Sequence, residues 1–437
     1  MRPLGGAGRS PWEAPMSKML TARDVEGASG KRLVLGKGDR LTPLARDRAK
    51  ELGVELVDSE PPAGSPAATR AEPPRTTVPL GARVPVRASG LPFVLPPSGA
   101  MYRRNALGPA AGETTATTSA GRSNRPTAAV IGAGHVGAMT ALRLAESDLF
   151  ANVALVDVVP GLAAGLALDI GHGAGLYGFS TTIAGSDDLA ALSGADYVVI
   201  TAGKPRQPGM SRTDLTAVNA VIIESVCRAI RVHAPGSTVV VVTNPLEEMT
   251  HLAASYTGFA DERVIGMAGV LDTARFCSLV GQTGRAKPQD VRALALGSHG
   301  PEMVIPLSQA YIGDTPIESV FDAETLKAIV ERTRESGGEI VKLLQTGSAY
   351  FAPAESAAMM VRAMASDNGE VLAACVRSRM AYGTRDTRVG LPVRLSRRGV
   401  KEIVALPLRA DEQLALREAA SRIETRIAEL GRRGQAA

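Results

Sequence analysis

Short, almost uninterrupted apolar runs alternating with helical stretches are the feature that most restricts the fold of this 437-residue chain. Four such runs follow residue 126: TAAVIGA at 127–133, NVALVD at 152–157, DYVVITAG at 196–203 and TVVVVTNP at 238–245. Strands have this composition when both of their faces are buried, as in a parallel sheet covered by helices. The pattern therefore predicts an α/β fold built on a doubly wound parallel sheet.

A glycine-rich turn lies where the first apolar run ends. It has the spacing Gly-x-Gly-x-x-Gly, opens a helical stretch, and consists of Gly132, Ala133, Gly134, His135, Val136 and Gly137. The first glycine permits a tight turn, the second lets a pyrophosphate approach the main chain, and the third lets the helix pack close to the strand. An anion is also favoured at the helix N-terminus. The turn predicts a dinucleotide-binding Rossmann fold with His135 and Val136 beside the cofactor.

Asp157 ends the next run, about 25 residues after the first glycine. A carboxylate at this place accepts hydrogen bonds from ribose hydroxyls and repels a 2′-phosphate, so NAD is favoured over NADP. The alternative is an ordinary turn that ends a strand, with a solvated Asp157.

Beyond residue 268 the chain becomes more helical. Residues 324–345 and 409–430 have helical periodicity, and residues 291–300 and 389–396 read as strands. We expect a Rossmann domain over 126–268 followed by an α+β catalytic domain over 269–437.

The first 125 residues differ from the rest in charge and composition. They hold 19 of the 49 Lys and Arg residues but only 11 of the 44 Asp and Glu residues, and more than half of the 28 prolines lie at or before Pro126. Such a segment buries too little apolar surface to fold, so we expect the extension to be largely disordered, above all the linker at 58–125.

Within the extension, residues 31–58 predict a small β-α-β element in which Thr42 and Pro43 start the helix and Gly53 ends it. LPFVLPP at 91–97 is a candidate docking peptide.

Several classes of protein are disfavoured by composition. No apolar run is long enough to span a membrane. Three widely spaced cysteines predict neither disulfides nor a metal site, which favours a reducing, cytoplasmic setting. No stripe of basic and aromatic residues indicates nucleic-acid binding.

Candidate catalytic groups lie in two polar motifs. His299, in Gly-Ser-His-Gly at a strand end, is the best general base because imidazole titrates near neutral pH. Asp272 and Arg275 are three residues apart in a helical stretch and share a face, so Asp272 can orient His299 while Arg275 binds a carboxylate. The alternatives are a surface histidine and an ordinary ion pair on a helix.

A Pro- and Gly-rich loop after the third run carries Arg206 and Arg212. Ligands bind where strands of such sheets end, so the loop is a candidate lid. Asn244, before Pro245 at the end of the fourth run, is a candidate both to donate to the substrate oxygen and to contact the cofactor, although Asn before Pro is also a common turn residue.

Together these motifs resemble the lactate/malate dehydrogenase superfamily, and within it the lactate-dehydrogenase-like branch of malate dehydrogenases. The resemblance covers about Thr127 to Leu430 and is carried, in order, by TAGKPRQPGMSR at 201–212, VTNP at 242–245, MAGVLDTARF at 267–276, LGSHG at 296–300 and TGSAYFAPA at 346–354. It implies an NAD-dependent 2-hydroxy-acid dehydrogenase that forms a homodimer or homotetramer.

The resemblance also implies roles for individual residues. Arg212 would polarise the substrate carbonyl, and Asn219 would lie near the nicotinamide ribose. Ser348 would line the pocket. Arg206 would hold a second carboxylate where lactate enzymes have Gln, which favours malate as the substrate. Lactate or another 2-hydroxy acid is the alternative substrate, and a catalytically inactive NAD-binding subunit is the alternative from another class.

Two positions depart from the family pattern. Glu247 follows Thr-Asn-Pro-Leu where members usually carry Asp, and Pro301-Glu302 replaces a typical Gly-Asp after the His-Gly pair. Neither departure removes a proposed catalytic group, so they bear on loop geometry rather than on the reaction.

TARDVEGASG at 21–30 and LTPLARDRAKELGVEL at 41–56 resemble N-terminal targeting segments of enzymes in bacterial microcompartments. This resemblance implies a shell protein as partner and a location inside a microcompartment. The alternative is a tail without a function.

Overall fold

The computed structural model describes residues 19–20, 25–28, 32–35, 39–41, 45, 48–49, 51–58, 125–205 and 211–434. They belong to two compact units, Met1–Pro92 and Phe93–Ala437, which are considered separately. The linker expected at 58–125 and the apolar segment at 91–97 lie almost wholly outside the described residues.

The N-terminal unit contains two pairs of short parallel strands. β1 (Met19–Leu20) pairs with β3 (Arg40–Leu41), and β2 (Arg32–Leu35) pairs with β4 (Glu55–Asp58). Val25, Ala45 and Ala49 are buried at its centre, with Leu33, Val54 and Leu56 packed against them. The strands expected at the two ends of 31–58 are therefore present. The expected helix start at Thr42 and Pro43 lies outside the described residues, whereas Gly53, the expected end, has φ +61°.

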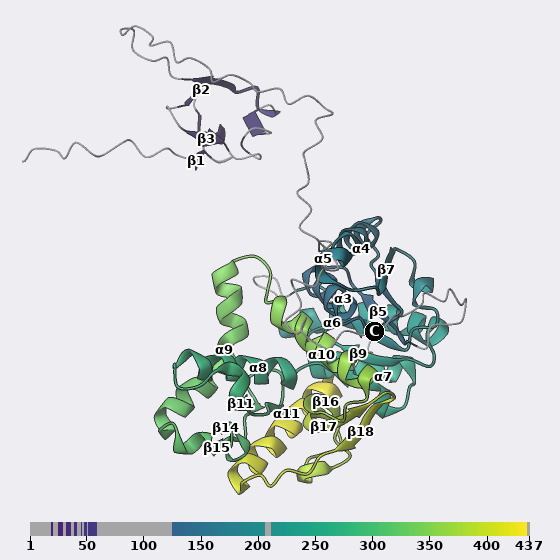
Figure 1. Cartoon of the computed structure of the whole chain (residues 1–437), viewed down its shortest axis with the longest axis vertical. Helices are drawn as coiled ribbons and strands as arrows, with labels where there is room; N and C mark the ends of the chain where they lie inside the picture. The colour runs from purple at the N-terminus through teal and green to yellow at the C-terminus, as the bar shows by residue number, and fades with distance from the viewer. Residues whose placement is uncertain are drawn as a thin grey trace, which may run out of the picture. The chain divides into compact units, whose positions relative to one another are not determined.

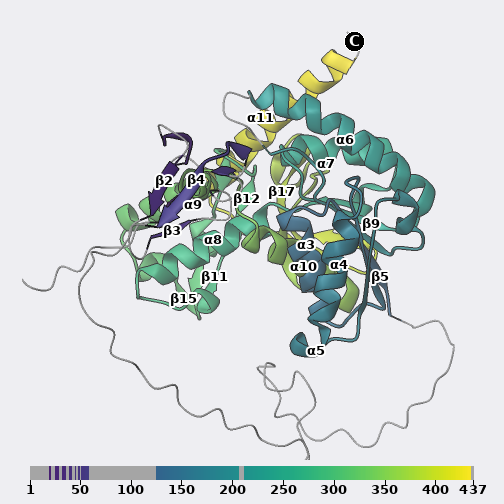
Figure 2. The ribbon, with the colours of Figure 1, turned by 90° about the horizontal axis from the view of Figure 1, so that it is seen from above.

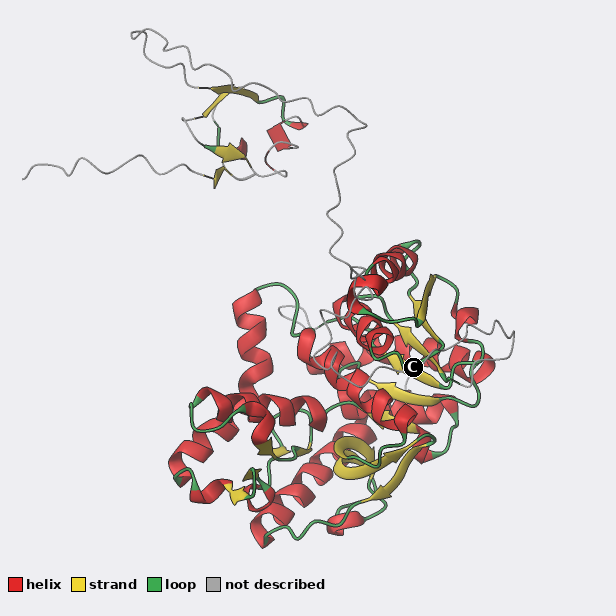
Figure 3. Ribbon diagram, in the orientation of Figure 1, coloured by secondary structure: helices red, strands yellow, loops and turns green. Residues whose placement is uncertain are grey.

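The second unit is organised around one large sheet, shown among its helices in Figures 1 and 3. Six strands form its parallel part: β5 (Thr127–Ile131), β6 (Asn152–Val156), β7 (Thr182–Ser186), β8 (Tyr197–Ile200), β9 (Thr238–Val241) and β10 (Val264–Gly266). Their spatial order is β10-β9-β8-β5-β6-β7. The four predicted strands are confirmed, and the fold class with them.

Helices cover both faces of these parallel strands. They are α3 (His135–Glu146), α4 (Leu162–His172), α5 (Ala174–Tyr177), α6 (Arg212–His233) and α7 (Leu246–Thr257), and α10 (Phe351–Ser366) of the second half packs beside α3. Neighbouring residues of one strand enter different cores: Val130 packs with residues of α3 and α10, while Ile131 packs with residues of α6 and α7. Figure 2 shows these two sets of helices on either side of the strands. Burial on both faces explains why the strands read as continuous apolar runs.

The second half of the unit continues the same sheet instead of forming a separate one. β10 pairs antiparallel with β16 (Val371–Arg377), and the sheet extends through β17 (Arg388–Ser396), β12 (Leu296–Gly297) and β13 (Met303–Val304), with β18 (Gly399–Ile403) on β17. A separate three-stranded sheet contains β11 (Val291–Arg292), β14 (Tyr311–Ile312) and β15 (Thr315–Pro316). The two predicted helices are α9 (Ala323–Leu344) and α11 (Ala410–Gly434), and α8 (Gly269–Gln282) carries the Asp272 motif. The expected strand at 291–300 is divided into β11 and β12.

Candidate active site

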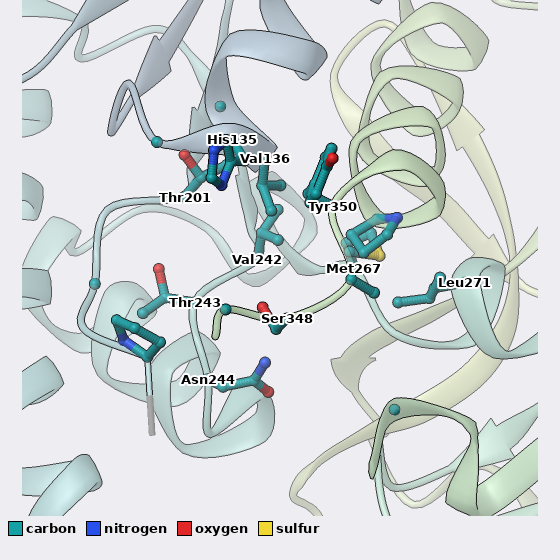
Figure 4. A pocket seen from close by; sticks show the side chains of 18 of the residues that line it. His135, Val136, Thr201, Val242, Thr243, Asn244, Met267, Leu271, Ser348 and Tyr350 are labelled. Atoms are coloured by element: carbon teal, nitrogen blue, oxygen red, sulfur yellow. The ribbon is translucent and has the colours of Figure 1, made fainter. Parts of the chain in front are cut away.

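A pocket of about 490 Å³ lies at the carboxyl ends of β5, β8 and β9. Figure 4 shows residues of the glycine turn, such as His135 and Val136, and Asn244 and Ser348 among its walls. Its lining combines residues of both halves of the unit: Gly134, His135, Val136, Gly137, Thr201, Gly203, Lys204, Pro205, Val242, Thr243, Asn244, Met267, Leu271, Arg275, His299, Gly337, Val341, Gly347, Ser348, Ala349, Tyr350 and Pro353. The volume lies in the range of sites for small molecules and cofactors.

The three glycines of the turn are required for three different reasons. Gly132 has φ +100°, a left-handed conformation that other residues rarely adopt. A Cβ on Gly137 would lie 1.7 Å from the Gly132 carbonyl oxygen, so the close contact of helix and strand excludes a side chain. A Cβ on Gly134 would meet no atom of the described residues within 4 Å, and Gly134 lines the pocket. That open space leaves room for a ligand to approach the main chain.

The turn opens α3 without help from a side chain. Gly134 is the N-cap and makes no side-chain cap hydrogen bond, and the first turn of the helix contains no acidic residue. The first N–H groups of α3 are therefore not bonded by a side-chain cap. They lie at the positive end of the helix dipole, next to the pocket. This main-chain arrangement fits a pyrophosphate.

Asp157 and Thr201 hold the glycine turn in place. The two carboxylate oxygens of Asp157 accept the main-chain N–H groups of Ala133 at 2.6 Å and Val159 at 3.0 Å. The Thr201 hydroxyl lies 2.9 Å from the carbonyl oxygen of Gly132 and 3.0 Å from that of Ile131. Each Asp157 oxygen has further lone pairs, so the predicted bonds from ribose hydroxyls are compatible with this geometry.

On the other side of the pocket, α8 and the turn after β12 bring Asp272, Arg275 and His299 together. His299 Nδ1 lies 2.8 Å from Asp272 Oδ2, and Arg275 Nη1 donates to Asp272 Oδ1 at 3.0 Å. The Asp272 side chain is 2% exposed and that of Arg275 is 13% exposed. The face shared by Asp272 and Arg275 is as predicted, and the bond from Asp272 reaches a residue 27 positions away.

The bond to Asp272 determines which nitrogen of His299 is available. An ionised carboxylate only accepts, so Nδ1 must carry the proton and Nε2 of the neutral ring is left as the acceptor. Burial lowers the pKa of His299, but the charge and hydrogen bond of Asp272, aided by the Glu247 charge, outweigh burial and hold the pKa above its ordinary value. The arrangement is therefore able to take up a proton and stabilise the resulting imidazolium.

The loop that carries the two other arginines is described only in part. Arg206 lies outside the described residues. Arg212 begins α6, where Ser211 and Asp214 form a capping box, but its side chain is outside the described part. Their proposed contacts with substrate remain predictions.

Of the predicted amide and hydroxyl groups, Asn244 and Ser348 line the pocket and Asn219 does not. Asn219 is 1% exposed; its Nδ2 donates to the carbonyl of Asn244 at 2.7 Å, and its Oδ1 accepts the N–H of Lys204 at 2.8 Å. Asn219 therefore joins the ends of β8 and β9 beneath the pocket, and its predicted contact with the cofactor remains a prediction.

Several lining residues were not singled out from the sequence. Tyr350 stacks on His135 with ring centroids 4.9 Å apart, and Met267 and Val242 add apolar walls. The signal for Thr201 and Gly203 was their place directly after a strand, inside a motif already noted. Met267 and Tyr350 also lie inside quoted motifs, 267–276 and 346–354, but their place in the pocket wall depends on how the two halves pack.

Among the described residues, no group of three or more His, Cys, Asp or Glu side chains is arranged to hold a metal ion. No helix in the described part is long and apolar enough to cross a membrane.

Comparison with known proteins shows similarity over nearly the whole second unit. Residues 127–266 match the family described as lactate/malate dehydrogenase, NAD binding domain, and residues 269–432 match lactate/malate dehydrogenase, alpha/beta C-terminal domain. A malate dehydrogenase of Trichormus variabilis is 42% identical over 303 residues, which are 69% of this chain and 93% of that protein. One from Bacillus cytotoxicus is 44% identical over 294 residues, 67% of this chain and 94% of the relative.

Solved structures give the same result. Malate dehydrogenase from Salinibacter ruber is 37% identical with a TM-score of 0.68, covering 71% of this chain and 100% of that chain. A lactate dehydrogenase from Cryptosporidium parvum, complexed with lactic acid and nicotinamide adenine dinucleotide, is 34% identical with a TM-score of 0.68 and covers 70% of this chain and 98% of its own.

Proposed function

This chain belongs to the lactate/malate dehydrogenase family, and we propose that it is an NAD-dependent malate dehydrogenase that interconverts malate and oxaloacetate. The observation that carries this function is the Asp272–His299 pair, which lies with Arg275 at the pocket beside the glycine turn. The curated relatives named above are malate dehydrogenases at 42% and 44% identity, which favours malate over lactate within the family. We also propose that the chain belongs to the lactate-dehydrogenase-like branch of malate dehydrogenases, which its motifs resemble.

The residues of the glycine turn fit NAD. The open space at Gly134 and the N–H groups at the start of α3 would hold the pyrophosphate, Asp157 the adenosine ribose, and His135 and Val136 the pocket side of the cofactor. Bound NAD supplies the hydride acceptor for a secondary alcohol. An inactive NAD-binding subunit would not need a buried Asp272 bonded to an imidazole at the same pocket.

His299 acts as the acid and base. Its Nε2 takes the hydroxyl proton of malate, and Asp272 stabilises the imidazolium that forms. In the reverse direction the same nitrogen returns the proton to the oxygen of oxaloacetate. The raised pKa of His299 suits the second task, because a protonated ring must be available near neutral pH.

Arg275 binds the carboxylate next to the reacting carbon, since its guanidinium is partly buried and its fork matches two oxygens. We assign the second carboxylate to Arg206 and the carbonyl oxygen to Arg212 and Asn244, with Ser348 along the wall. These four assignments follow the family pattern.

The deciding experiment is an NADH absorbance assay of the purified enzyme with oxaloacetate and, separately, pyruvate. Preference for oxaloacetate is expected, and the variant Arg206→Gln should shift the ratio of kcat/KM values toward pyruvate. A preference for pyruvate in the wild type would reassign the enzyme to lactate. Turnover of neither substrate, with NADH bound, would indicate an inactive subunit.

We further propose that residues 126–268 and 269–437 act as the cofactor and catalytic domains of a homodimer or homotetramer. Leu168 on α4 and Leu176 on α5 are 61% and 65% exposed, and Leu343 near the end of α9 is 75% exposed. Leu168 and Leu176 lie on the adjoining helices α4 and α5, and contiguous exposed apolar surface is typical of sites that bind another protein. Light scattering should give a dimer or tetramer mass, and Leu168→Glu should lower it; a monomer mass for the wild type would reject the assembly.

We propose that residues 1–125 direct the enzyme to a shell protein of a bacterial microcompartment within the cytoplasm. The N-terminal unit forms two parallel strand pairs and leaves Val34 62% exposed and Leu52 46% exposed, which supports a small folded element with apolar contacts to offer. Deleting residues 1–125 should spare kcat and abolish co-localisation with shell proteins. Unchanged localisation would leave the extension a tail without this function.

A further inference from the structure

The turn that carries His299 is bound by a second carboxylate besides Asp272. Glu247, in the first turn of α7, does not line the pocket, yet its Oε1 accepts the main-chain N–H of His299 at 2.5 Å. The residue is 1% exposed, so no water competes for this bond. Two carboxylates, 25 positions apart in the sequence, thus bind the ring and the backbone of the same histidine.

A third carboxylate binds the neighbouring residue of the turn. Glu302 Oε2 accepts a hydrogen bond from the hydroxyl of Ser298 at 2.8 Å, and its Oε1 lies 3.3 Å from Nη1 of Arg426 on α11. Nε of the same arginine donates to Glu248 at 3.1 Å. Arg426 therefore connects the start of α7, which carries Glu247 and Glu248, with the turn that carries the histidine.

The two departures from the family pattern consequently meet at one place. Glu247 is one methylene longer than the usual Asp, and Glu302 lies in the segment that replaces the usual Gly-Asp. Both side chains bind the turn itself, one at His299 and the other at Ser298. The two residues that differ from the family pattern thus both contact the turn that carries His299.

We propose that Glu247 and Glu302 are positioning residues for His299: they fix the main chain on which the imidazole is mounted, so that Nε2 keeps its direction toward the reacting hydroxyl. The proposal rests on the role of His299 in the proposed function. The bond to Asp272 sets the orientation of the ring but does not fix the main chain of the turn that carries it. Anchoring the main chain as well leaves one orientation, and displacements of about 1 Å cost up to a hundredfold in rate.

The geometry of Glu247 separates this role from simple stabilisation of the fold. Its Oε2 has no hydrogen-bond partner among the described residues. Burial, reinforced by the charge of Glu248, raises the pKa of Glu247. Burying a carboxyl with a vacant oxygen costs the folded state desolvation free energy, which the bond to the His299 N–H offsets only in part. Glu247 is thus better explained by what it does for His299 than by what it adds to stability.

The matched pair Glu247→Gln and Glu247→Met tests the proposal. Gln keeps an oxygen at the same reach and should hold kcat within about threefold, whereas Met removes the acceptor and should lower kcat by about tenfold or more. E247M leaves the buried N–H of His299 without this acceptor, so its free energy of unfolding should fall, and kcat is compared per folded enzyme. KM for malate and the Kd for NADH should change by less than about twofold in both variants. Equal kcat values for E247M and the wild type would overturn the role of Glu247.

Glu412→Met is the control for a general effect of removing a buried glutamate. Glu412 is 7% exposed and accepts hydrogen bonds from the main-chain N–H of Ser308 at 3.0 Å and from its hydroxyl at 2.6 Å. Its other bond among the described residues is to Arg409, so it does not bind the His299 turn there. Its kcat per folded enzyme should stay at the wild-type value. A loss in E412M equal to that in E247M would show a structural effect and overturn the proposal.

The variant Glu302→Met is a second test of the proposal, and it does not depend on whether E247M folds. The Glu302 side chain is 16% exposed, so its replacement by Met should disturb the fold less than a change at the fully buried Glu247. We expect kcat to fall about threefold, because Ser298 is one residue removed from the base. Wild-type kcat in E302M would overturn the role of Glu302, and with an unfolded E247M it would overturn the whole proposal. Wild-type and H299A enzymes assayed beside these variants test the proposed function separately, since only they report whether His299 is the base.

Discussion

The two halves that meet in the pocket recognise their ligands by different means. Residues 127–266 contribute main-chain conformation: a glycine turn with φ +100° at Gly132, open space at Gly134 and a helix start without a side-chain cap. Residues 269–434 contribute charged side chains, namely Asp272, Arg275 and His299 in contact with one another. Binding of the pyrophosphate is thus a property of one short segment, whereas proton transfer depends on residues brought together by the fold. The comparison predicts that changes in the two halves have separable effects.

The largest effect is expected in the catalytic half. His299→Ala removes the only proposed base and should lower kcat for malate oxidation at least about a thousandfold. The glycine turn is untouched, so the Kd for NADH measured by fluorescence should stay within about twofold of the wild type. An H299A enzyme that turns over at the wild-type rate would remove His299 from the mechanism, and a large loss of NADH binding would remove the separation between the halves.

Glycine variants should give the opposite result in the cofactor half. Gly137→Ala places a Cβ 1.7 Å from the Gly132 carbonyl oxygen, so the turn must open and the Kd for NADH should rise about a hundredfold, with a loss of about 1–3 kcal/mol in the free energy of unfolding.

Gly134→Ala is the matched variant, because its Cβ meets nothing within 4 Å and Gly134 has an extended conformation that alanine adopts without strain. Its thermal unfolding should match the wild type while the Kd for NADH rises about tenfold. Calorimetric unfolding and NADH titration of both variants decide the matter; equal NADH affinity in G134A and the wild type would show that the cofactor does not approach this residue.

The pH dependence should separate the two halves a third time, with a smaller effect. Malate oxidation needs neutral His299, so its kcat/KM should fall about tenfold per pH unit as the pH drops below the pKa of His299, which lies above the ordinary value of 6.5. Oxaloacetate reduction needs the imidazolium and should decline as the pH rises above the same pKa. Stopped-flow profiles in both directions should share that pKa, while NADH affinity stays level across it. Profiles that lose activity on the same side in both directions would contradict a single base.

The contrast between the halves also explains what could be predicted from the sequence. The glycine turn and the apolar strands are local, so the parallel sheet, the cofactor site and NAD followed from spacing. Asp272 and His299 are joined across 27 positions and Glu247 and His299 across 52, and no local pattern encodes either distance. The first pair was reached through the family motif, and the second was found only in the structure.

Other features depend on tertiary packing for the same reason. β16 adds to β10 through a single registered pair, Gly266 and Cys375, and so joins the two predicted domains into one sheet. The Asn219 side chain makes three hydrogen bonds to the main chain of Lys204 and Asn244, an arrangement that no local pattern indicated, and its contact with the cofactor remains a prediction. Sequence indicates which polar residues cluster near strand ends, whereas packing decides which of them face the pocket.

The smallest expected effect lies at Thr201, which supports the glycine turn from β8 with a side chain. Its hydroxyl faces the carbonyls of Ile131 and Gly132, so Thr201→Val removes about 1 kcal/mol from the free energy of unfolding and should raise the Kd for NADH about twofold to threefold. Thr201→Ser keeps the hydroxyl and should restore both values.

Because Thr201 touches the turn and not the catalytic pair, kcat should be unchanged in either variant. If T201V lowered kcat while leaving the Kd for NADH as in the wild type, the cofactor turn and the catalytic groups would be coupled through β8, and the division between a main-chain half and a side-chain half would no longer hold.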